Sequence, residues 1–124
     1  MAIAKLRSVV LDCPDTMALA QFYLELLGWE LSYTESVEEG GWIMLSDGGY
    51  VHLAFQLAPD YRPPSWPDPE SPQQFHLDLM VDDLDVAERQ ALELGATKVS
   101  TQPSPEDFRV FRDPAGHLFC LCVR

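Results

Sequence analysis

The chain has 124 residues, of which 20 are acidic and 8 basic, so its formal net charge is −12, and 47% of its residues are hydrophobic. These values predict one globular domain over residues 1–124 and exclude a disordered chain. The acidic excess argues against binding to nucleic acids or to an anionic membrane, because both need basic side chains. A neutral or cationic small ligand is easier to accommodate.

The three cysteines, Cys13, Cys120 and Cys122, are too few and too oddly spaced to predict a disulfide framework. No apolar run approaches the length of a membrane span. Acidic residues at Asp12 and Asp15 interrupt the place where a signal peptide would carry its apolar core. We therefore expect a cytoplasmic protein with reduced thiols.

The first half of the chain, about residues 5–57, is predicted to fold as a strand, a helix and three antiparallel strands. Asp15 is a helix N-cap, Gly28 ends the helix, and Asp47 with Gly48 makes a strong hairpin signal. Strands are expected at residues 6–12, 29–34, 42–45 and 50–57.

Residues 58–74 contain six prolines, which is too many for a helix or a central strand. This segment is expected to be a linker at the surface. Its aromatic residues Tyr61 and Trp66 could fold back onto a neighbouring element.

The second half, about residues 75–124, repeats the order of the first. Asp83 caps a predicted helix and Gly95 ends it, while residues 113–116 have turn chemistry. Strands are expected at residues 75–81, 96–100, 108–112 and 118–123. The chain is thus predicted to be an α+β fold of two βαβββ modules. Each helix covers one face of its sheet, and the other faces can curl into a shared cup.

Short motifs in both halves occur in the order of a known fold. They are Val10-Leu11-Asp12-Cys13-Pro14-Asp15, Leu27-Gly28-Trp29, His76-Leu77-Asp78-Leu79, Val81-Asp82-Asp83-Leu84, Leu94-Gly95-Ala96 and Asp113-Pro114-Ala115-Gly116-His117. With these motifs the chain resembles the vicinal-oxygen-chelate superfamily, in its glyoxalase-like and bleomycin-resistance branch. The resemblance implies a curled mixed sheet around a cup, a small-molecule ligand and a homodimer. It does not specify the reaction, because one fold supports many functions.

Strand alternation predicts which side chains line the cup. In the second module His76, Asp78 and Met80 face it, together with Cys120 of the last strand. His76 and Asp78 share one face and could form an acid/base pair, which makes them the candidate catalytic residues.

In the first module His52 and Gln56 are expected to face the cup. Trp42 and Met44 share one face and could lie at the mouth of the cup. Aromatic and methionine side chains suit a largely apolar pocket with a few polar groups.

The resemblance further implies that metal-dependent members take one His, Glu or Gln ligand from each of four strands. His76 lies at the ligand position of the second module, and His52 or Gln56 occupies another, depending on the register of that strand. Ser8 and Cys120 depart from this pattern at the remaining positions.

Three hypotheses follow from this incomplete ligand set. The first is a metal-free cup that binds a small molecule, as bleomycin-resistance proteins do. The second is a lyase, isomerase or dioxygenase that holds Zn²⁺, Ni²⁺, Mn²⁺ or Fe²⁺ with His76, with either His52 or Gln56, and with Cys120 as a further candidate ligand. The third is a metal-free enzyme in which His76 and Asp78 transfer a proton. The cofactor is therefore either absent or a divalent metal.

Overall fold

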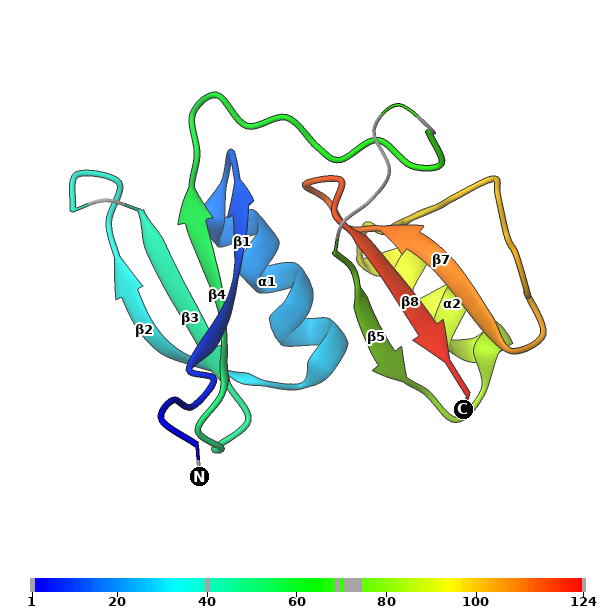
Figure 1. Cartoon of the computed structure of the whole chain (residues 1–124), viewed down its shortest axis with the longest axis horizontal. Helices are drawn as coiled ribbons and strands as arrows, with labels where there is room; N and C mark the ends of the chain where they lie inside the picture. The colour runs from blue at the N-terminus through cyan, green and yellow to red at the C-terminus, as the bar shows by residue number, and fades with distance from the viewer. Residues whose placement is uncertain (1, 40, 69, 71–74, 124) are drawn as a thin grey trace. The chain divides into compact units, whose positions relative to one another are not determined.

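The computed structural model describes residues 2–39, 41–68, 70 and 75–123. The chain divides into two compact units, Met1–Tyr61 (unit 1) and Arg62–Arg124 (unit 2). The boundary between them falls inside the predicted linker. Each unit has the order βαβββ, so the fold class is α+β with two modules, as predicted (Figure 1).

Unit 1 is a four-stranded mixed sheet with one helix. Its elements are β1 (Ser8–Cys13), α1 (Thr16–Leu27), β2 (Glu30–Glu35), β3 (Trp42–Ser46) and β4 (His52–Leu57). The strands are ordered β1-β4-β3-β2, with β1 parallel to β4 and the other pairs antiparallel. The predicted hairpin around Asp47 and Gly48 is confirmed, because it joins the antiparallel strands β3 and β4.

Unit 2 repeats this topology. Its elements are β5 (Leu77–Met80), α2 (Leu84–Leu94), β6 (Thr97–Lys98), β7 (Phe108–Arg112) and β8 (Leu118–Cys122). The strands are ordered β5-β8-β7-β6, again with one parallel pair, β5 with β8. The strand β5 is shorter than the predicted 75–81, so His76 lies just before it.

Both helices begin and end where the sequence predicts. The side chain of Asp15 accepts a hydrogen bond from the backbone N–H of Ala18 at 3.0 Å, and Asp83 caps α2 in the same way. Gly28 and Gly95 have φ of 69° and 118°, the left-handed conformation that glycine adopts without strain. Within the described residues, neither helix combines the length and the apolar character needed to span a membrane.

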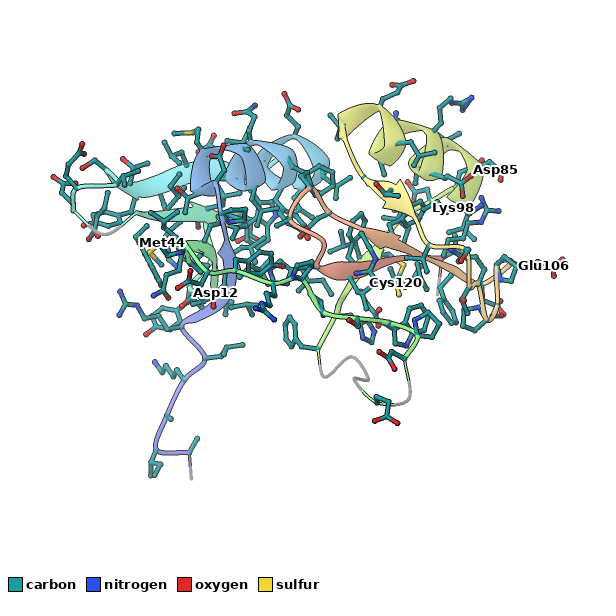
Figure 2. The ribbon with its side chains drawn as sticks, turned by 90° about the horizontal axis from the view of Figure 1, so that it is seen from above. Asp12, Met44, Asp85, Lys98, Glu106 and Cys120 are labelled. Carbon is teal, nitrogen blue, oxygen red and sulfur yellow. The ribbon has the colours of Figure 1, made fainter. Side chains whose placement is uncertain are left out.

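Each helix packs on one face of its own sheet, and stacked aromatic rings fill the core on that side. Tyr23 of α1 stacks on Phe55 of β4 with ring centroids 5.8 Å apart, and both side chains are fully buried. In unit 2, Phe111 and Phe119 stack at 5.6 Å in the corresponding core. Because strand side chains alternate, the remaining residues point to the opposite face of each sheet, which we call the free face. Figure 2 shows each helix on one side of its sheet and, on the other, Met44 in unit 1 and Cys120 in unit 2.

Residues 63–68 of the Pro-rich segment fold back onto the free face of the unit 2 sheet. Trp66 packs against a buried apolar cluster there. The members of this cluster are Val99, Val110, Leu118 and Cys120. The sequence predicted that Trp66 could fold back, and this is confirmed.

The guanidinium group of Arg112 fixes the Pro-rich segment in place. It donates hydrogen bonds to the backbone carbonyls of Pro64, Trp66 and Gly116, each at 2.9 Å. Prolines supply no N–H group, so a run of them forms few backbone hydrogen bonds of its own. The hydrogen bonds from Arg112 in β7 therefore hold a segment that forms few backbone hydrogen bonds of its own.

Substitution Arg112→Ala is expected to lower the free energy of unfolding by about 2 kcal/mol or more, because it leaves three half-buried carbonyls without their charged donor. Urea denaturation followed by tryptophan fluorescence measures this. The matched control is Arg89→Ala, at an exposed arginine of α2, which should change stability by less than about 0.5 kcal/mol. Equal effects of the two substitutions would show that Arg112 does not anchor the segment.

Candidate functional site

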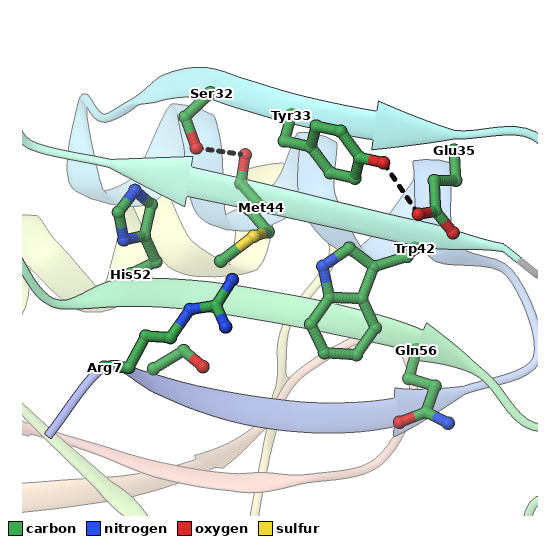
Figure 3. A pocket seen from close by; sticks show the side chains of 9 residues that line it. Arg7, Ser32, Tyr33, Glu35, Trp42, Met44, His52 and Gln56 are labelled. Carbon is green, nitrogen blue, oxygen red and sulfur yellow. Dashed lines mark hydrogen bonds between the residues drawn. The ribbon is translucent and has the colours of Figure 1, made fainter.

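The free face of the unit 1 sheet carries an open pocket of about 790 Å³ (Figure 3). This volume lies in the range of small-molecule sites. The pocket is lined by Arg7, Ser8, Ser32, Tyr33, Glu35, Trp42, Met44, His52 and Gln56. The four residues of unit 1 that the sequence nominated for ligand binding, Trp42, Met44, His52 and Gln56, are thus together in one pocket.

The strand register explains why these side chains share a face. Trp42 of β3 pairs with Gln56 of β4, and Ser8 of β1 pairs with His52. Paired residues point to the same side of a sheet. The register that the sequence left open is therefore fixed: the neighbour of Ser8 is His52, and Gln56 lies opposite Asp12.

A backbone contact fixes the ring of His52. Its Nδ1 lies 2.9 Å from the carbonyl oxygen of Tyr50. A carbonyl oxygen can only accept, so Nδ1 carries the proton, and in the neutral ring Nε2 is the hydrogen-bond acceptor. The neutral ring of His52 on β4 therefore offers its Nε2 to the pocket as a hydrogen-bond acceptor.

Four pocket residues were not found from the sequence: Arg7, Ser32, Tyr33 and Glu35. Arg7 precedes β1, and the other three lie on β2, where the pairing with β3 shifts between Leu31 and Tyr33. Where the pairing shifts in this way, the alternation of side chains along the strand no longer predicts which face of the sheet each residue points to. The hydroxyl of Tyr33 donates to Glu35 Oε1 at 2.7 Å, which holds this carboxylate at the rim (Figure 3).

The candidate residues of unit 2 form a second group. His76 Nε2 lies 3.1 Å from Asp78 Oδ1, and Asp78 pairs with Cys120 across β5 and β8. The nitrogen, oxygen and sulfur atoms of these three side chains all lie within 4.8 Å of one another. Met80, on the same strand face, is 72% exposed. The structure thus brings His76 into contact with Asp78, while their catalytic role stays a prediction.

Burial, followed by the nearby Asp78 carboxylate and Cys122, raises the pKa of the Cys120 thiol to about 12. The pKa of Cys122 is also raised, first by burial and then by Asp78. A raised pKa means less thiolate at a given pH, and the thiolate is the nucleophile. Neither thiol is therefore suited to nucleophilic catalysis near neutral pH.

At pH 8 the folded protein should alkylate Cys120 with iodoacetamide about a thousandfold more slowly than the urea-unfolded chain, because a pKa near 12 depletes the thiolate by that factor. Mass spectrometry of the labelled peptide measures the rate. Asp78→Asn removes one of the causes that raise this pKa and should speed labelling several-fold, whereas Asp82→Asn should not. Fast labelling of Cys120 in the native protein would contradict this assignment.

A model of the glyoxalase-like domain family matches residues 8–122, which include all ten helices and strands of the described residues. The chain belongs to the glyoxalase-like domain family. The predicted membership of the vicinal-oxygen-chelate superfamily is thereby confirmed. A comparison with curated proteins gives no match.

Solved structures share the glyoxalase-like fold at low sequence identity. Fosfomycin resistance protein FosX from Mesorhizobium loti is 16% identical, with 99% of this chain and 94% of that chain covered and a TM-score of 0.72. TnmS3, an antibiotic binding protein from Streptomyces sp. CB03234, is 23% identical, with coverage of 98% and 97% and a TM-score of 0.59. Glyoxalase I of Leishmania major is 14% identical, with coverage of 96% and 86% and a TM-score of 0.68.

The four strand positions of the glyoxalase-like metal centre do not all hold suitable ligands in this chain. Ser8 and His52 are neighbours on β1 and β4, and a neutral serine hydroxyl is not among the usual ligands of Zn²⁺. In β8 the position expected to hold a carboxylate is Cys120, which is 6% exposed and packed within an apolar cluster. This donor set does not fit a centre of four His, Glu or Gln ligands.

Proposed function

We propose that this glyoxalase-like protein binds a small molecule in the pocket on the free face of its unit 1 sheet, without a complete four-strand metal centre. The observation that carries the proposal is the convergence of Trp42, Met44, His52 and Gln56 on this one pocket. These residues come from two neighbouring strands and combine apolar with polar groups, the usual composition of a small-molecule site.

The chemistry of the lining favours an aromatic ligand with hydrogen-bonding groups. The indole of Trp42 and the thioether of Met44 offer flat, polarisable contact area. The imidazole Nε2 of His52 and the amide of Gln56 can fix the orientation of polar groups. Glu35 at the rim and the net charge of −12 favour a neutral or cationic molecule.

The similarity in fold to an antibiotic binding protein and to a fosfomycin resistance protein suggests where to look for the ligand. Antibiotics with an aromatic, cationic part suit the lining better than a small phosphonate. Bleomycin is therefore the first compound to test, and fosfomycin is the comparison.

The proposal includes a cytoplasmic homodimer. Within the described residues, β1 and β2 are the edge strands of the unit 1 sheet, and β5 and β6 are those of the unit 2 sheet. Edge strands present unpaired backbone groups, which a second copy of the chain can cover. Light scattering should therefore give twice the mass of 14.0 kDa.

Calorimetric titration tests the binding. Bleomycin should bind to the native protein, and Trp42→Ala should weaken that binding at least tenfold, about 1.4 kcal/mol, because the stacking surface is lost. The matched control is Trp29→Ala, outside the pocket, which should leave the affinity within about twofold. His52→Ala should also weaken binding.

Two results would contradict the proposal. One is that neither bleomycin, nor fosfomycin, nor a wider panel of aromatic antibiotics binds. The other is that a compound binds equally well to the native protein and to Trp42→Ala.

A further inference from the structure

We propose that the pocket of unit 1 selects a zwitterionic aromatic molecule, with a carboxylate bound by Arg7 at one end and a cationic group bound by Glu35 at the other. Both side chains line the pocket. This inference rests on the proposed function. It narrows the class of ligand from aromatic molecules in general to those that carry both charges.

The sheet topology places Arg7 and Glu35 at opposite ends of the pocket. Strand β1 is parallel to β4, and β4 and β2 are both antiparallel to β3, so β1 and β2 run in the same direction. Arg7 lies immediately before the first residue of β1, whereas Glu35 is the last residue of β2. Figure 3 shows the guanidinium group of Arg7 pointing into the pocket toward Met44, with Glu35 at the other end, beyond Trp42.

The strand register gives the distance between the two ends. Ser8 pairs with His52 at one end, and Gln56 pairs with Trp42 at the other. His52 and Gln56 are four residues apart on β4, so these two rows of side chains are about 13 Å apart. Because the charged side chains reach inward from both ends, a ligand that spans the pocket carries its two charges on the order of 10 Å apart.

The guanidinium group of Arg7 is available to a ligand. The backbone carbonyl of Arg7 accepts a hydrogen bond from the N–H of His52 at 2.9 Å, which fixes the chain at the start of β1. Among the residues that the structure describes, the guanidinium group itself forms no hydrogen bond or ion pair. Lys5, the other basic residue of unit 1, lies 5.9 Å from the ring centroid of Tyr50 and does not line the pocket.

The surroundings of Arg7 favour a carboxylate over a phosphate. A planar guanidinium group can bind either anion through two parallel hydrogen bonds. With nine acidic and two basic residues, unit 1 has a formal net charge of −7, which repels a doubly charged phosphate more strongly than a singly charged carboxylate. The hydroxyl group of Ser8, at the same end of the pocket, can donate a further hydrogen bond to a carboxylate.

The opposite end of the pocket is suited to a cation. The hydroxyl of Tyr33 donates to Oε1 of Glu35 at 2.7 Å, which holds this carboxylate in place. Trp42 pairs with Glu35 on the neighbouring strand and lines the same pocket. A cation is attracted both by a carboxylate and by the face of an indole ring. A zwitterion is neutral overall, which fits the acidic charge of the chain.

The test uses ciprofloxacin as a probe, because its carboxylate and its secondary ammonium group lie at opposite ends of a flat aromatic ring system. Its methyl ester keeps only the cation, and its N-acetyl derivative keeps only the anion. In calorimetric titrations of the whole protein, each derivative should bind at least about tenfold more weakly than ciprofloxacin, because each loses one charge-assisted contact.

Two substitutions assign the charges to the two ends. Arg7→Ala should weaken the binding of ciprofloxacin at least about tenfold more than that of the methyl ester, which has no carboxylate to lose. Glu35→Gln should weaken the binding of ciprofloxacin more than that of the N-acetyl derivative. The matched controls, Lys5→Ala and Glu30→Gln, change exposed charges outside the pocket lining and should alter each affinity by less than about twofold. Circular dichroism and thermal unfolding check that each variant is folded.

Three results would overturn the inference. They are equal binding of ciprofloxacin and its methyl ester, an equal loss of both affinities in Arg7→Ala, and no binding of ciprofloxacin to a protein that binds bleomycin. Each of these, together with a successful bleomycin titration, would leave the proposed pocket intact. Failure of every compound, bleomycin included, would instead reject the proposed function and this inference with it.

Discussion

A helix that covers one face of a four-stranded sheet leaves every second side chain of each strand pointing to the other face, and that face must be covered or used. Both units of this protein face this constraint. Tyr23 and Phe55 fill the helix side in unit 1, as Phe111 and Phe119 do in unit 2. The chemistry of the protein is therefore concentrated on the two free faces.

The two units meet the constraint differently although their topology is the same. In unit 1 the free face is hollowed into a pocket with apolar and polar lining. In unit 2 the Pro-rich segment brings Trp66 over an apolar cluster, and Arg112 holds that segment by three carbonyls. His76 and Asp78 lie at the β5 edge of this sheet, with their side chains 3.1 Å apart. This division favours small-molecule binding in unit 1.

Much of the fold could be predicted from the sequence because the signals are local. Asp15 and Asp83 cap the helices, Gly28 and Gly95 end them, and each effect involves residues within one turn. Alternation along the strands also predicted which side chains of β4 and β8 share a face. These rules depend only on neighbours in the chain.

The parts that could not be predicted depend on contacts between distant residues. Arg112 binds carbonyls 46 and 48 residues earlier, and no periodicity in a run of prolines indicates that partner. Because the pairing of β2 with β3 shifts between Leu31 and Tyr33, alternation did not predict which residues of β2 line the pocket. The strand register that sets Ser8 beside His52 likewise follows from the parallel pairing of β1 with β4, which the sequence leaves open.

The most direct test of the account is fluorine NMR on protein labelled with 5-fluorotryptophan. The chain has three tryptophans, so the spectrum has three resonances, which Trp→Phe variants assign to Trp29, Trp42 and Trp66. On addition of bleomycin the account predicts a shift of the Trp42 resonance, with Trp29 and Trp66 unchanged. A shift confined to Trp66 would place the ligand on the free face of unit 2 and contradict the account.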